Sequence, residues 1–538
     1  MSESVEATPV RCMAPYAPTF LSGPAHYMRF SSIPSLLISA GFLAVASPAS
    51  SQSPFPVPSA ESLPLEEGRE ELLRGCNLCH PIMAMLGQQR TEPEWRGVVD
   101  AMRGRGAKVT DEEAARITQY LAKHFAPGMP VRRGAGRMPG GRTFVLGGRP
   151  PDAEPVIGSP LETRDPVGAN QKPAFAGQTR APAVRTRTAV EAKIVARGLD
   201  HPWALAFLPK GRMLITEKPG AMRVVSATGE VGAPIANVPK VLYRSDGGLL
   251  DLVIDPKFAR NRQIYFAYSE PREGGSGLTL ASARLSDDET ALESVRVLLR
   301  IEPTHTSVSH FGCRLLFDQQ GKLFMTSGER MDPAIRVQAQ DLDSRLGKLL
   351  RLNTDGSAAP GNPFANTAGA LPDIWTYGHR NSQGLAWHPR TRELWSIEHG
   401  EAGGDELNLI KPGHNYGWPK IAYGMEYDRR PIYDGITAAP KMDQPLYFWD
   451  PAIGPTGMAF YDGKLIPEWR NNLFVAGHLS QHLVRLVLDG HRVVGEERLL
   501  LDQKQMMRWV GQGPDGALWV LTDDADGRLI RLSAQKKR

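Results

Sequence analysis

The sequence predicts an all-β six-bladed propeller preceded by a small all-α domain. Two observations predict it: a Cys-x-x-Cys-His motif at residues 76–80, and a strand–turn–strand pattern that recurs six times after residue 190. A chain of 538 residues with 41% apolar and 22% charged residues exceeds one ordinary domain and can bury a large core. At least two domains are therefore expected.

Residues 1–51 are interpreted as an N-terminal extension with a signal peptide. Arg29 precedes an apolar run over residues 36–46 and small residues over 44–49, as in secretory signals. Met28 is the expected start, which leaves Cys12 outside the natural protein. The run is too short to span a bilayer, and no other apolar run in the sequence is long enough. We expect a periplasmic or secreted protein without a transmembrane segment in the mature chain.

Residues 61–129 are predicted to form a cytochrome c domain with a covalent haem c. Two thiols three positions apart, Cys76 and Cys79, reach the two vinyl groups of one porphyrin, and the adjacent imidazole of His80 points at the iron. The alternatives are a zinc half-site and a redox-active dithiol. Zinc needs a second ligand pair, which Cys12 and Cys313 do not supply at a suitable spacing.

Two helices are expected in this domain, one over residues 65–73 and one from Thr110, which forms a capping box with Glu113. Met102 is the predicted sixth ligand of the haem iron, because it follows Trp95 and Val98 on a helical segment that ends near residue 104. Each methionine of the domain has the alternative of filling the core. Three others compete for the iron: Met83, Met85 and Met129.

Residues 130–189 are interpreted as a Pro-, Gly- and Arg-rich linker. Residues 131–190 hold ten Lys and Arg against four Asp and Glu, an excess that accounts for the formal net charge of +5. The folded domains are then near neutral, so the charge is not a nucleic-acid footprint. We expect no nucleic-acid partner.

Residues 190–535 are predicted to form the propeller. An apolar strand, a turn with Pro, Asp or Gly, and a second apolar strand recur at residues 203–216, 250–268, 314–326, 384–397, 457–475 and 510–522. A pair of β-sandwiches is the rival arrangement, but six similar hairpins favour radial closure. Long loops then gather at one end of the central channel, where a site is expected.

These loops carry an ordered set of short motifs. From about residue 194 to residue 532 the sequence resembles the soluble, propeller-type sugar dehydrogenases that use pyrroloquinoline quinone (PQQ), especially the aldose dehydrogenase branch. The motifs that carry the resemblance are His201-Pro202-Trp203, Gly247-Gly248-Leu249-Leu250-Asp251, His310-Phe311-Gly312-Cys313-Arg314-Leu315, Gly378-His379-Arg380-Asn381-Ser382-Gln383-Gly384 and Gly404-Asp405-Glu406-Leu407-Asn408.

The resemblance implies two cofactors in the propeller. PQQ is a flat quinone with three carboxylates, so its pocket needs cationic forks and amide donors. Calcium would be bound by main-chain carbonyls at Gly400 and Glu401 and would act as a Lewis acid. The positions that match family residues holding PQQ are Arg380, Asn381, Gln383 and Arg508.

The resemblance also implies that His310 is the general base that takes the proton of the sugar C1 hydroxyl. Histidine suits this role because its ordinary pKa of about 6.5 leaves it neutral near physiological pH. A lone loop histidine more often serves as a hydrogen-bonding residue, but the surrounding motif favours catalysis. Asp246 stands where the family has Gln and is a candidate contact of PQQ or substrate, and Ser309 stands where a sugar-contacting Asp can occur. The choice of substrate therefore stays open.

Four further departures from the family pattern bear on the cofactors. Met506 replaces an expected arginine and Ser480 an expected lysine, so one or two cofactor cations are missing. Cys313 replaces a glycine and is expected to be an inert packed thiol. Glu401 replaces a proline, so its side chain is either an extra carboxylate ligand of calcium or a solvated group.

The predicted function is that of a quinohaemoprotein oxidoreductase. An aldose or related alcohol is oxidised to its lactone or carbonyl by hydride transfer to PQQ, and electrons leave through haem c to an external acceptor, a cytochrome or the quinone pool. Two alternatives stay open on the sequence: a non-catalytic propeller that binds a glycan or protein beside an independent cytochrome, and a calcium-dependent lactonase. The missing cofactor cations favour the binding propeller, whereas His310, Arg380 and Arg508 oppose it.

Overall fold

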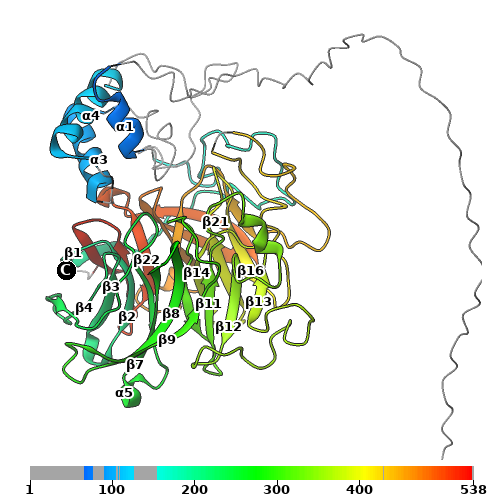
Figure 1. Ribbon diagram of the computed structural model, residues 1–538. Coiled ribbons are helices and arrows are strands. Elements are labelled where there is room, and N and C mark those ends of the chain that lie inside the picture. Colours follow the sequence, from blue (N-terminus) through cyan, green and yellow to red (C-terminus); the bar gives the residue numbers. More distant parts are fainter. Residues whose placement is uncertain are drawn as a thin grey trace, which may run out of the picture. The chain divides into compact units, whose positions relative to one another are not determined.

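The computed structural model describes residues 66–76, 90–104, 107, 109–126, 154–427 and 429–535. Most of this part is a ring of six four-stranded antiparallel sheets, as Figure 1 shows. In each sheet the strands follow in chain order, except that the first strand of the ring completes the last blade. The prediction of an all-β six-bladed propeller is confirmed.

The first three blades are consecutive four-stranded meanders. Blade 1 consists of β2 (Pro202–Phe207), β3 (Met213–Glu217), β4 (Ala221–Val225) and β5 (Val231–Pro234). Blade 2 consists of β6 (Leu249–Ile254), β7 (Gln263–Arg272), β8 (Gly275–Leu285) and β9 (Leu292–Arg300). Blade 3 consists of β10 (Leu315–Phe317), β11 (Leu323–Ser327), β12 (Lys348–Leu352) and β13 (Ile374–Tyr377).

The last three blades repeat the pattern. Blade 4 consists of β14 (Ser382–Trp387), β15 (Leu394–Glu398), β16 (Asp405–Ile410) and β17 (Tyr447–Trp449). Blade 5 consists of β18 (Pro455–Phe460), β19 (Leu473–Gly477), β20 (His482–Asp489) and β21 (Arg492–Leu499). Blade 6 consists of β22 (Met507–Gln512), β23 (Leu518–Thr522), β24 (Gly527–Ala534) and β1 (Val190–Leu199).

The ring is closed by hydrogen bonds between its two ends. Strand β1 pairs antiparallel with β24, from Val190 opposite Ala534 to Leu199 opposite Gly527. The first strand and the last strand of the propeller therefore share one blade. Opening the ring would break this ladder as well as the packing between blades.

The second strand of most blades is buried along its whole length. β3, β11, β15, β19 and β23 are each buried at every position. Each blade is covered on both faces by its neighbours, so these strands are mostly apolar, and their few polar residues are buried as well. This is why the six predicted hairpins were visible in the sequence.

Arg314, which directly precedes β10, joins five blades through one guanidinium. It is 6% exposed, and its Nη1 donates to Asp251 Oδ1 of blade 2 at 2.9 Å. Its Nε donates to the carbonyl of Gln383 in blade 4 at 2.9 Å, and its Nη2 donates to the carbonyl of Thr456 in blade 5 at 2.8 Å. The guanidinium also lies over the ring of Trp203 in blade 1, 4.5 Å from its centre.

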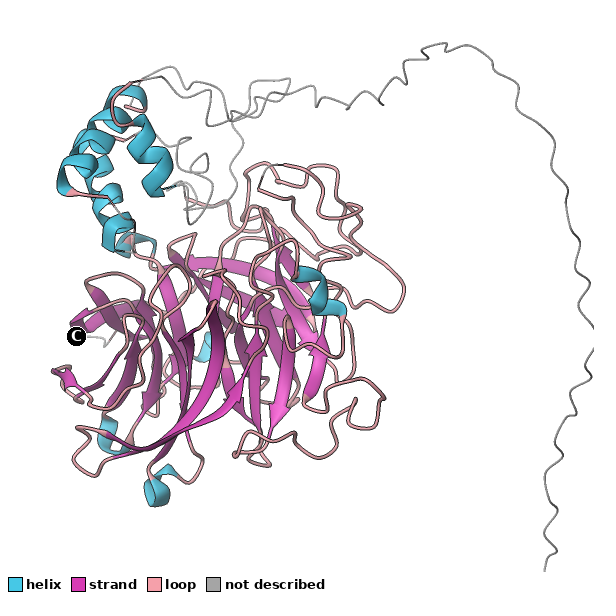
Figure 2. Cartoon of the chain, viewed as in Figure 1, coloured by secondary structure: helices cyan, strands magenta, loops and turns pink. Residues whose placement is uncertain are grey.

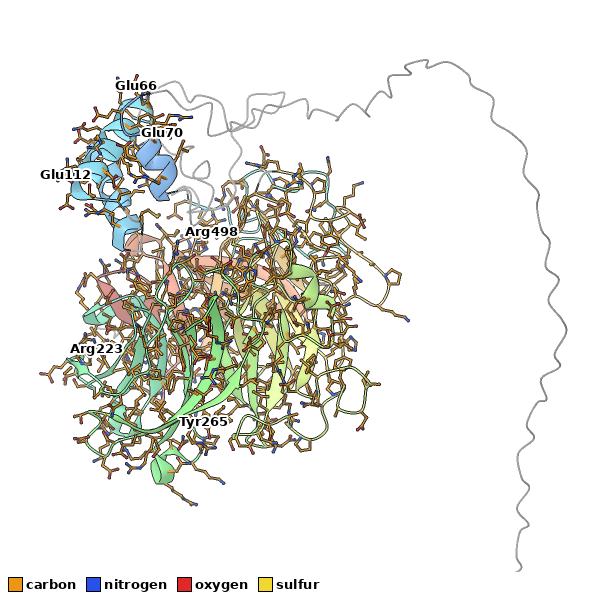
Figure 3. The ribbon with its side chains drawn as sticks, in the orientation of Figure 1. Glu66, Glu70, Glu112, Arg223, Tyr265 and Arg498 are labelled. Atoms are coloured by element: carbon orange, nitrogen blue, oxygen red, sulfur yellow. The ribbon has the colours of Figure 1, made fainter. Side chains whose placement is uncertain are left out.

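Three helices before residue 130 share an apolar cluster of their own. α1 (Arg69–Cys76), α3 (Glu92–Gly104) and α4 (Asp111–His124) pack around Leu72, Trp95 and Ile117. Figure 2 shows these helices in cyan, and Figure 3 labels acidic residues on them. The predicted capping box of Thr110 and Glu113 at the start of α4 is present.

The predicted haem ligands are only partly within the described residues. Cys76 is the last residue of α1, and Met102 lies half-buried on α3. Cys79, His80 and the competing Met83, Met85 and Met129 lie outside the described residues. The haem and its ligands therefore stay predictions. None of the helices in the described ranges is long and apolar enough to cross a membrane.

Residues 154–189, which we call the strap, pack against the propeller. The sequence placed them in a linker that ran to residue 189. In the structure Ala183 instead forms a parallel bridge with Glu496 of β21, and Leu161, Val167 and Ala183 are buried. Arg498 of β21, labelled in Figure 3, donates to Glu162 of the strap at 3.0 Å. The high Pro, Gly and Arg content hid the few apolar residues that fasten this segment.

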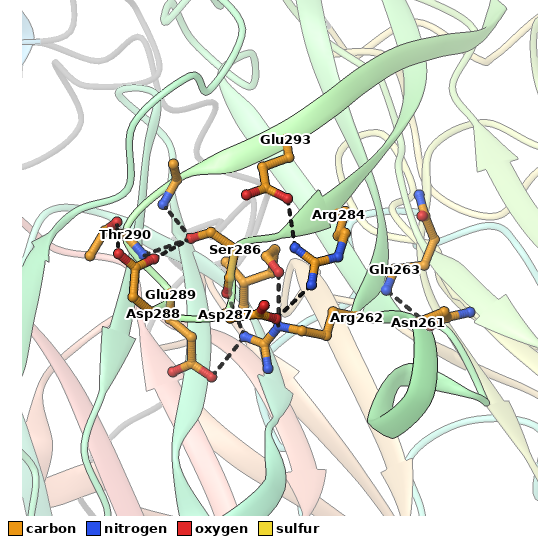
Figure 4. Close-up of polar contacts among 12 residues, drawn as sticks. Asn261, Arg262, Gln263, Arg284, Ser286, Asp287, Asp288, Glu289, Thr290 and Glu293 are labelled. Atoms are coloured by element: carbon orange, nitrogen blue, oxygen red, sulfur yellow. Dashed lines mark hydrogen bonds and ion pairs between the residues drawn. The ribbon is translucent and has the colours of Figure 1, made fainter.

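The first prediction concerns the central ion pair. Replacing Arg314 by Met leaves the buried carboxylate of Asp251 without its cation, and we expect the free energy of unfolding to fall by about 3–5 kcal/mol. Arg284→Met is the matched control, because Arg284 pairs with Asp287 and Glu293 at the surface of blade 2 (Figure 4). Its cost should be about 1 kcal/mol or less. Urea unfolding of both variants measures the difference, and equal losses would contradict the role of Arg314.

Candidate active site

Every blade contributes polar side chains to one end of the ring. The first two strands of a blade are antiparallel, so residues before the first strand and after the second lie at the same end of the sheet. The residues in these two positions that interact there are His201 and Lys218 (blade 1), Asp246 (blade 2), His310 and Glu329 (blade 3), Arg380, His399 and Glu401 (blade 4), His478 (blade 5) and Asp523 (blade 6). Arg508 of β22 joins them.

His310 is buried and held on two sides. Its Nδ1 lies 2.5 Å from Glu329 Oε1, and its main-chain N–H donates to Asp246 Oδ2 at 3.1 Å. Its φ of +48° is a left-handed conformation that a non-glycine residue rarely adopts without support. The two acidic contacts therefore fix both the backbone and the ring of this histidine.

The pKa of His310 is lowered from its ordinary value. Burial is the main cause, and the positive charge of Arg380 adds to it, whereas Glu329 and Asp246 act in the opposite direction. The histidine is thus neutral over a wider range of pH than a free imidazole. A neutral imidazole bonded at Nδ1 to a carboxylate carries its basic lone pair on Nε2.

Glu329 and Arg330 support His310, and the sequence analysis did not single them out. Glu329 is 1% exposed, and its main-chain N–H donates to the carbonyl of Arg380 at 3.0 Å. Arg330 is 2% exposed; its Nε donates to the carbonyl of Ser309 at 3.2 Å, and its guanidinium lies 3.9 Å from the ring centre of Phe311. The available signal was an acidic and a basic residue two and three positions after the end of the buried strand β11.

Arg380 contacts the oxygens that were predicted to bind calcium. Its Nη1 donates to the carbonyl of Gly400, and its Nη2 pairs with the carboxylate of Glu401. The guanidinium of Arg380 thus stands where calcium was predicted. The carbonyl of Gly400 and the carboxylate of Glu401 therefore suit a positive charge. The Glu401 side chain is 8% exposed, so it is a buried partner of Arg380 and not a solvated group.

The opposite wall of the site is built on Asp523. Arg508 Nε donates to Asp523 Oδ2 at 2.9 Å, Lys218 Nζ lies 3.6 Å from the same oxygen, and His201 and His478 contact the carboxylate at 2.9 and 3.1 Å. Burial alone would raise the pKa of Asp523, but these neighbouring groups hold it well below its usual range. One carboxylate facing two permanent cations leaves this wall net positive.

The amides predicted to hold the cofactor serve the frame of the site in this structure. Arg508 Nη1 donates to Gln383 Oε1 at 3.1 Å, and Asn381 Oδ1 accepts the main-chain N–H of Gly312 at 3.0 Å. Asn381 thereby fixes the turn that follows His310. The structure thus brings together His310, Arg380, Asn381, Gln383, Arg508, Asp246, Gly400 and Glu401 at one end of the ring, although the contacts of Asn381 and Gln383 shown here are with the protein.

The site gathers positive charge and, among the described residues, a few buried polar atoms without partners. Three cations stand on three different blades, Lys218, Arg380 and Arg508, which suits a flat ligand with three carboxylates. Within the described part of the chain, three buried polar atoms at the site lack a hydrogen-bond partner: Glu329 Oε2, Arg380 Nε and His399 Nε2. Among the described residues no group of three or more His, Cys, Asp or Glu gathers as a metal site. Calcium would therefore depend on the carbonyl of Gly400 together with Glu401.

The residues that depart from the family pattern are accounted for individually. Ser480 is fully buried, and its Oγ has no hydrogen-bond partner among the described residues. Lys218, which the sequence analysis did not single out, supplies a cation in the same wall as Arg508. Cys313 is fully buried, and burial raises the pKa of its thiol well above the usual value. A thiol in this setting is unreactive, as predicted.

Comparison with known proteins gives a consistent result. A family model described as Glucose / Sorbosone dehydrogenase matches residues 199–531. The aldose sugar dehydrogenase YliI of Escherichia coli (strain K12) is 40% identical over 348 residues, which cover 64% of this chain and 93% of that protein. Quinoprotein glucose dehydrogenase B of Acinetobacter calcoaceticus is 31% identical over 414 residues, which cover 62% of this chain and 85% of that protein.

A solved structure agrees with the match to this family. The PQQ-bound form of an aldose sugar dehydrogenase from Streptomyces coelicolor is 28% identical with a TM-score of 0.54, and the match covers 65% of this chain and 99% of that one. The matched part of this chain is about as long as the propeller, and the family model begins after the strap.

The second prediction follows from His478. Burial, with the charge of Arg508, lowers its pKa to about 4, whereas the unfolded histidine titrates near 6.5. Between these values the unfolded state binds more protons, so the propeller should lose stability as the pH falls from 6.5 to 4. The side chain is 28% exposed, which reduces the effect to about 1–2 kcal/mol. Urea unfolding at several pH values measures how the free energy of unfolding depends on pH. This dependence should be weaker in His478→Gln, and an unchanged dependence would refute the lowered pKa of His478.

Proposed function

The chain belongs to the glucose/sorbosone dehydrogenase family and is an oxidoreductase that acts on CH–OH groups, and we propose that it is a periplasmic or secreted quinohaemoprotein. In this proposal it oxidises an aldose or a related alcohol with PQQ and calcium in the propeller, and passes the electrons to a covalent haem c. The observation that carries the proposal is the pairing of His310 with Glu329 beside three cations on three blades.

His310 is the proposed base for the substrate hydroxyl. Its Nδ1–H donates to Glu329, so Nε2 is the nitrogen that can take the hydroxyl proton. Glu329 then stabilises the imidazolium that forms. Asp246 adds a second negative charge near the ring and fixes the main chain of His310. The same two carboxylates thus orient the base and accommodate its positive charge.

PQQ, when bound, would supply the electrophilic carbonyl that accepts the hydride, and calcium would polarise that carbonyl. Arg380, Lys218 and Arg508 would bind its carboxylates, Asn381 and Gln383 would hold the pocket wall, and Gly400 and Glu401 would bind the calcium. Arg380 must then exchange Glu401 and Gly400 for the cofactor. If the substrate is an aldose, the product is a lactone.

The haem proposal depends on the Cys-x-x-Cys-His motif at Cys76, Cys79 and His80, with Met102 as the proposed sixth ligand. Two electrons from one substrate leave through a one-electron carrier singly, so an external acceptor such as a cytochrome or the quinone pool completes the cycle. Carrying both redox centres on one chain raises the effective concentration of the haem for the reduced cofactor.

Stopped-flow absorbance of the haem tests the proposal. Protein reconstituted with calcium and PQQ is mixed with a panel of aldoses and other alcohols. Haem reduction that requires both PQQ and one class of substrate supports the proposal and identifies that class. Lactone hydrolysis without PQQ would point to a lactonase, and absence of PQQ binding in a titration would point to a binding propeller beside an independent cytochrome.

The third prediction separates the base from its support. His310→Ala should lower kcat by about 10²–10⁴-fold with an external dye as acceptor, since it removes the general base. Glu329→Gln removes a group that raises the pKa of His310, so the acidic limb of kcat/KM should move to lower pH while kcat falls. Arg284→Met, at the surface of blade 2, is the control and should retain full activity. An acidic limb that moves to higher pH in Glu329→Gln would contradict this assignment.

A further inference from the structure

We propose that the strap is a brace for the loop that carries Gly400 and Glu401. The strap precedes the part of the chain that matches the family model, which begins at residue 199. Its role in the site rests on the proposed function of Gly400 and Glu401, but its contacts with the loop do not. The loop, residues 400–404, connects β15 to β16.

The loop is packed backbone against backbone on a second segment, residues 423–425. Ala402 N–H donates to the carbonyl of Met425 at 2.9 Å, and Met425 N–H donates back to Ala402 at 3.1 Å. A Cβ on Gly424 would lie 2.5 Å from the carbonyl oxygen of Gly403, and one on Gly404 would lie 2.0 Å from that of Tyr423. Only glycine allows this approach, so the two segments move together.

The strap holds the second segment through Gln171. The side-chain Nε2 of Gln171 donates to the carbonyl of Gly424 at 2.8 Å, and its Oε1 accepts the N–H of Gly424 at 2.6 Å. This bidentate contact satisfies both main-chain groups of one residue, as a neighbouring strand would. Gln171 therefore fastens the segment against which the loop is packed.

The strap holds the loop from another direction through Asp450. Val167 and Gly168 donate their main-chain N–H groups to the two carboxylate oxygens of Asp450 at 2.8 and 2.9 Å. A Cβ on Gly403 would lie 2.5 Å from Asp450 Oδ1 and 3.2 Å from Val167 Cβ. The carboxylate is buried, and with the strap removed it would lose both donors. Loop and strap thus share one buried acidic residue.

The loop in turn sets the positions of the Gly400 carbonyl and the Glu401 carboxylate. Gly404 N–H donates to the carbonyl of Trp449 at 2.9 Å, and Gly400 N–H donates to Asp405 Oδ1 at 2.8 Å. With both ends of the loop and its middle fixed, the carbonyl of Gly400 and the side chain of Glu401 stay directed at Arg380. Gln171 and Asp450 are therefore positioning residues that act through the loop.

Hydrogen exchange of the full chain without added cofactor or metal tests the brace. Gln171→Met keeps the side-chain volume and removes both bonds to Gly424, and we expect exchange at Ala402, Gly404 and Met425 to rise at least tenfold. Asp450→Asn is a second variant, in which one acceptor facing the strap becomes a donor, and it should act in the same direction.

Thr186→Val is the matched control. Thr186 also belongs to the strap, but its hydroxyl donates to Glu497 and accepts from Trp469 Nε1, away from the loop. It should leave exchange in residues 400–404 and 425 unchanged. Unchanged exchange in Gln171→Met, or an equal rise in Thr186→Val, would overturn the proposal.

Terbium luminescence provides the functional readout. Tb³⁺ takes the same oxygen ligands as calcium, and titration of the unloaded protein should give a Kd at least fivefold weaker for Gln171→Met than for the wild type and Thr186→Val. A rise in exchange together with no Tb³⁺ binding in the wild type would leave the brace standing and refute the proposed calcium site. Raised exchange with an unchanged Tb³⁺ Kd would overturn the positioning role.

Discussion

The buried pair of Arg314 and Asp251 is the interaction on which the rest of the propeller depends. A ring of blades has a polar main chain at its centre, and the inner strands cannot pair with one another across it. One guanidinium meets this need by bonding to blades 2, 4 and 5 and stacking on blade 1. Because Arg314 follows His310 by four residues, the same segment that locks the ring also carries the proposed base.

The site illustrates how a propeller concentrates charge. Each blade supplies few polar groups, but all of them emerge at the same end because every first hairpin runs in the same direction. Three cations and four carboxylates meet there; Glu401, Asp523 and Glu329 pair with cations or with histidine, and Asp246 accepts the main-chain N–H of His310. Arg380 is the clearest case, since it rests on the oxygens proposed for calcium. In the proposed function, binding of the cofactors would therefore be an exchange of partners.

The strap extends this dependence to residues outside the family model. Glu401 replaces an expected proline, so its loop lacks the rigidity that proline gives to a main chain. Contacts from Val167, Gly168 and Gln171 supply restraint from outside. A main-chain carbonyl has no side chain to direct it, so its position depends on the contacts of its loop, and the strap adds to those that the loop makes with Trp449 and Asp405.

The sequence by itself determined the six blades, the capping box at Thr110 and the region of the site, because these depend on local apolar patterns and on short motifs. It did not determine the partner of His310, the cation at Lys218 or the strap. Glu329 lies 19 residues from His310, and Asp450 lies 282 residues from Gly168. The β10–β11 hairpin brings Glu329 beside His310, and the packing of the strap brings Gly168 beside Asp450, so neither pairing can be read from one sequence. The tertiary structure decided them for that reason.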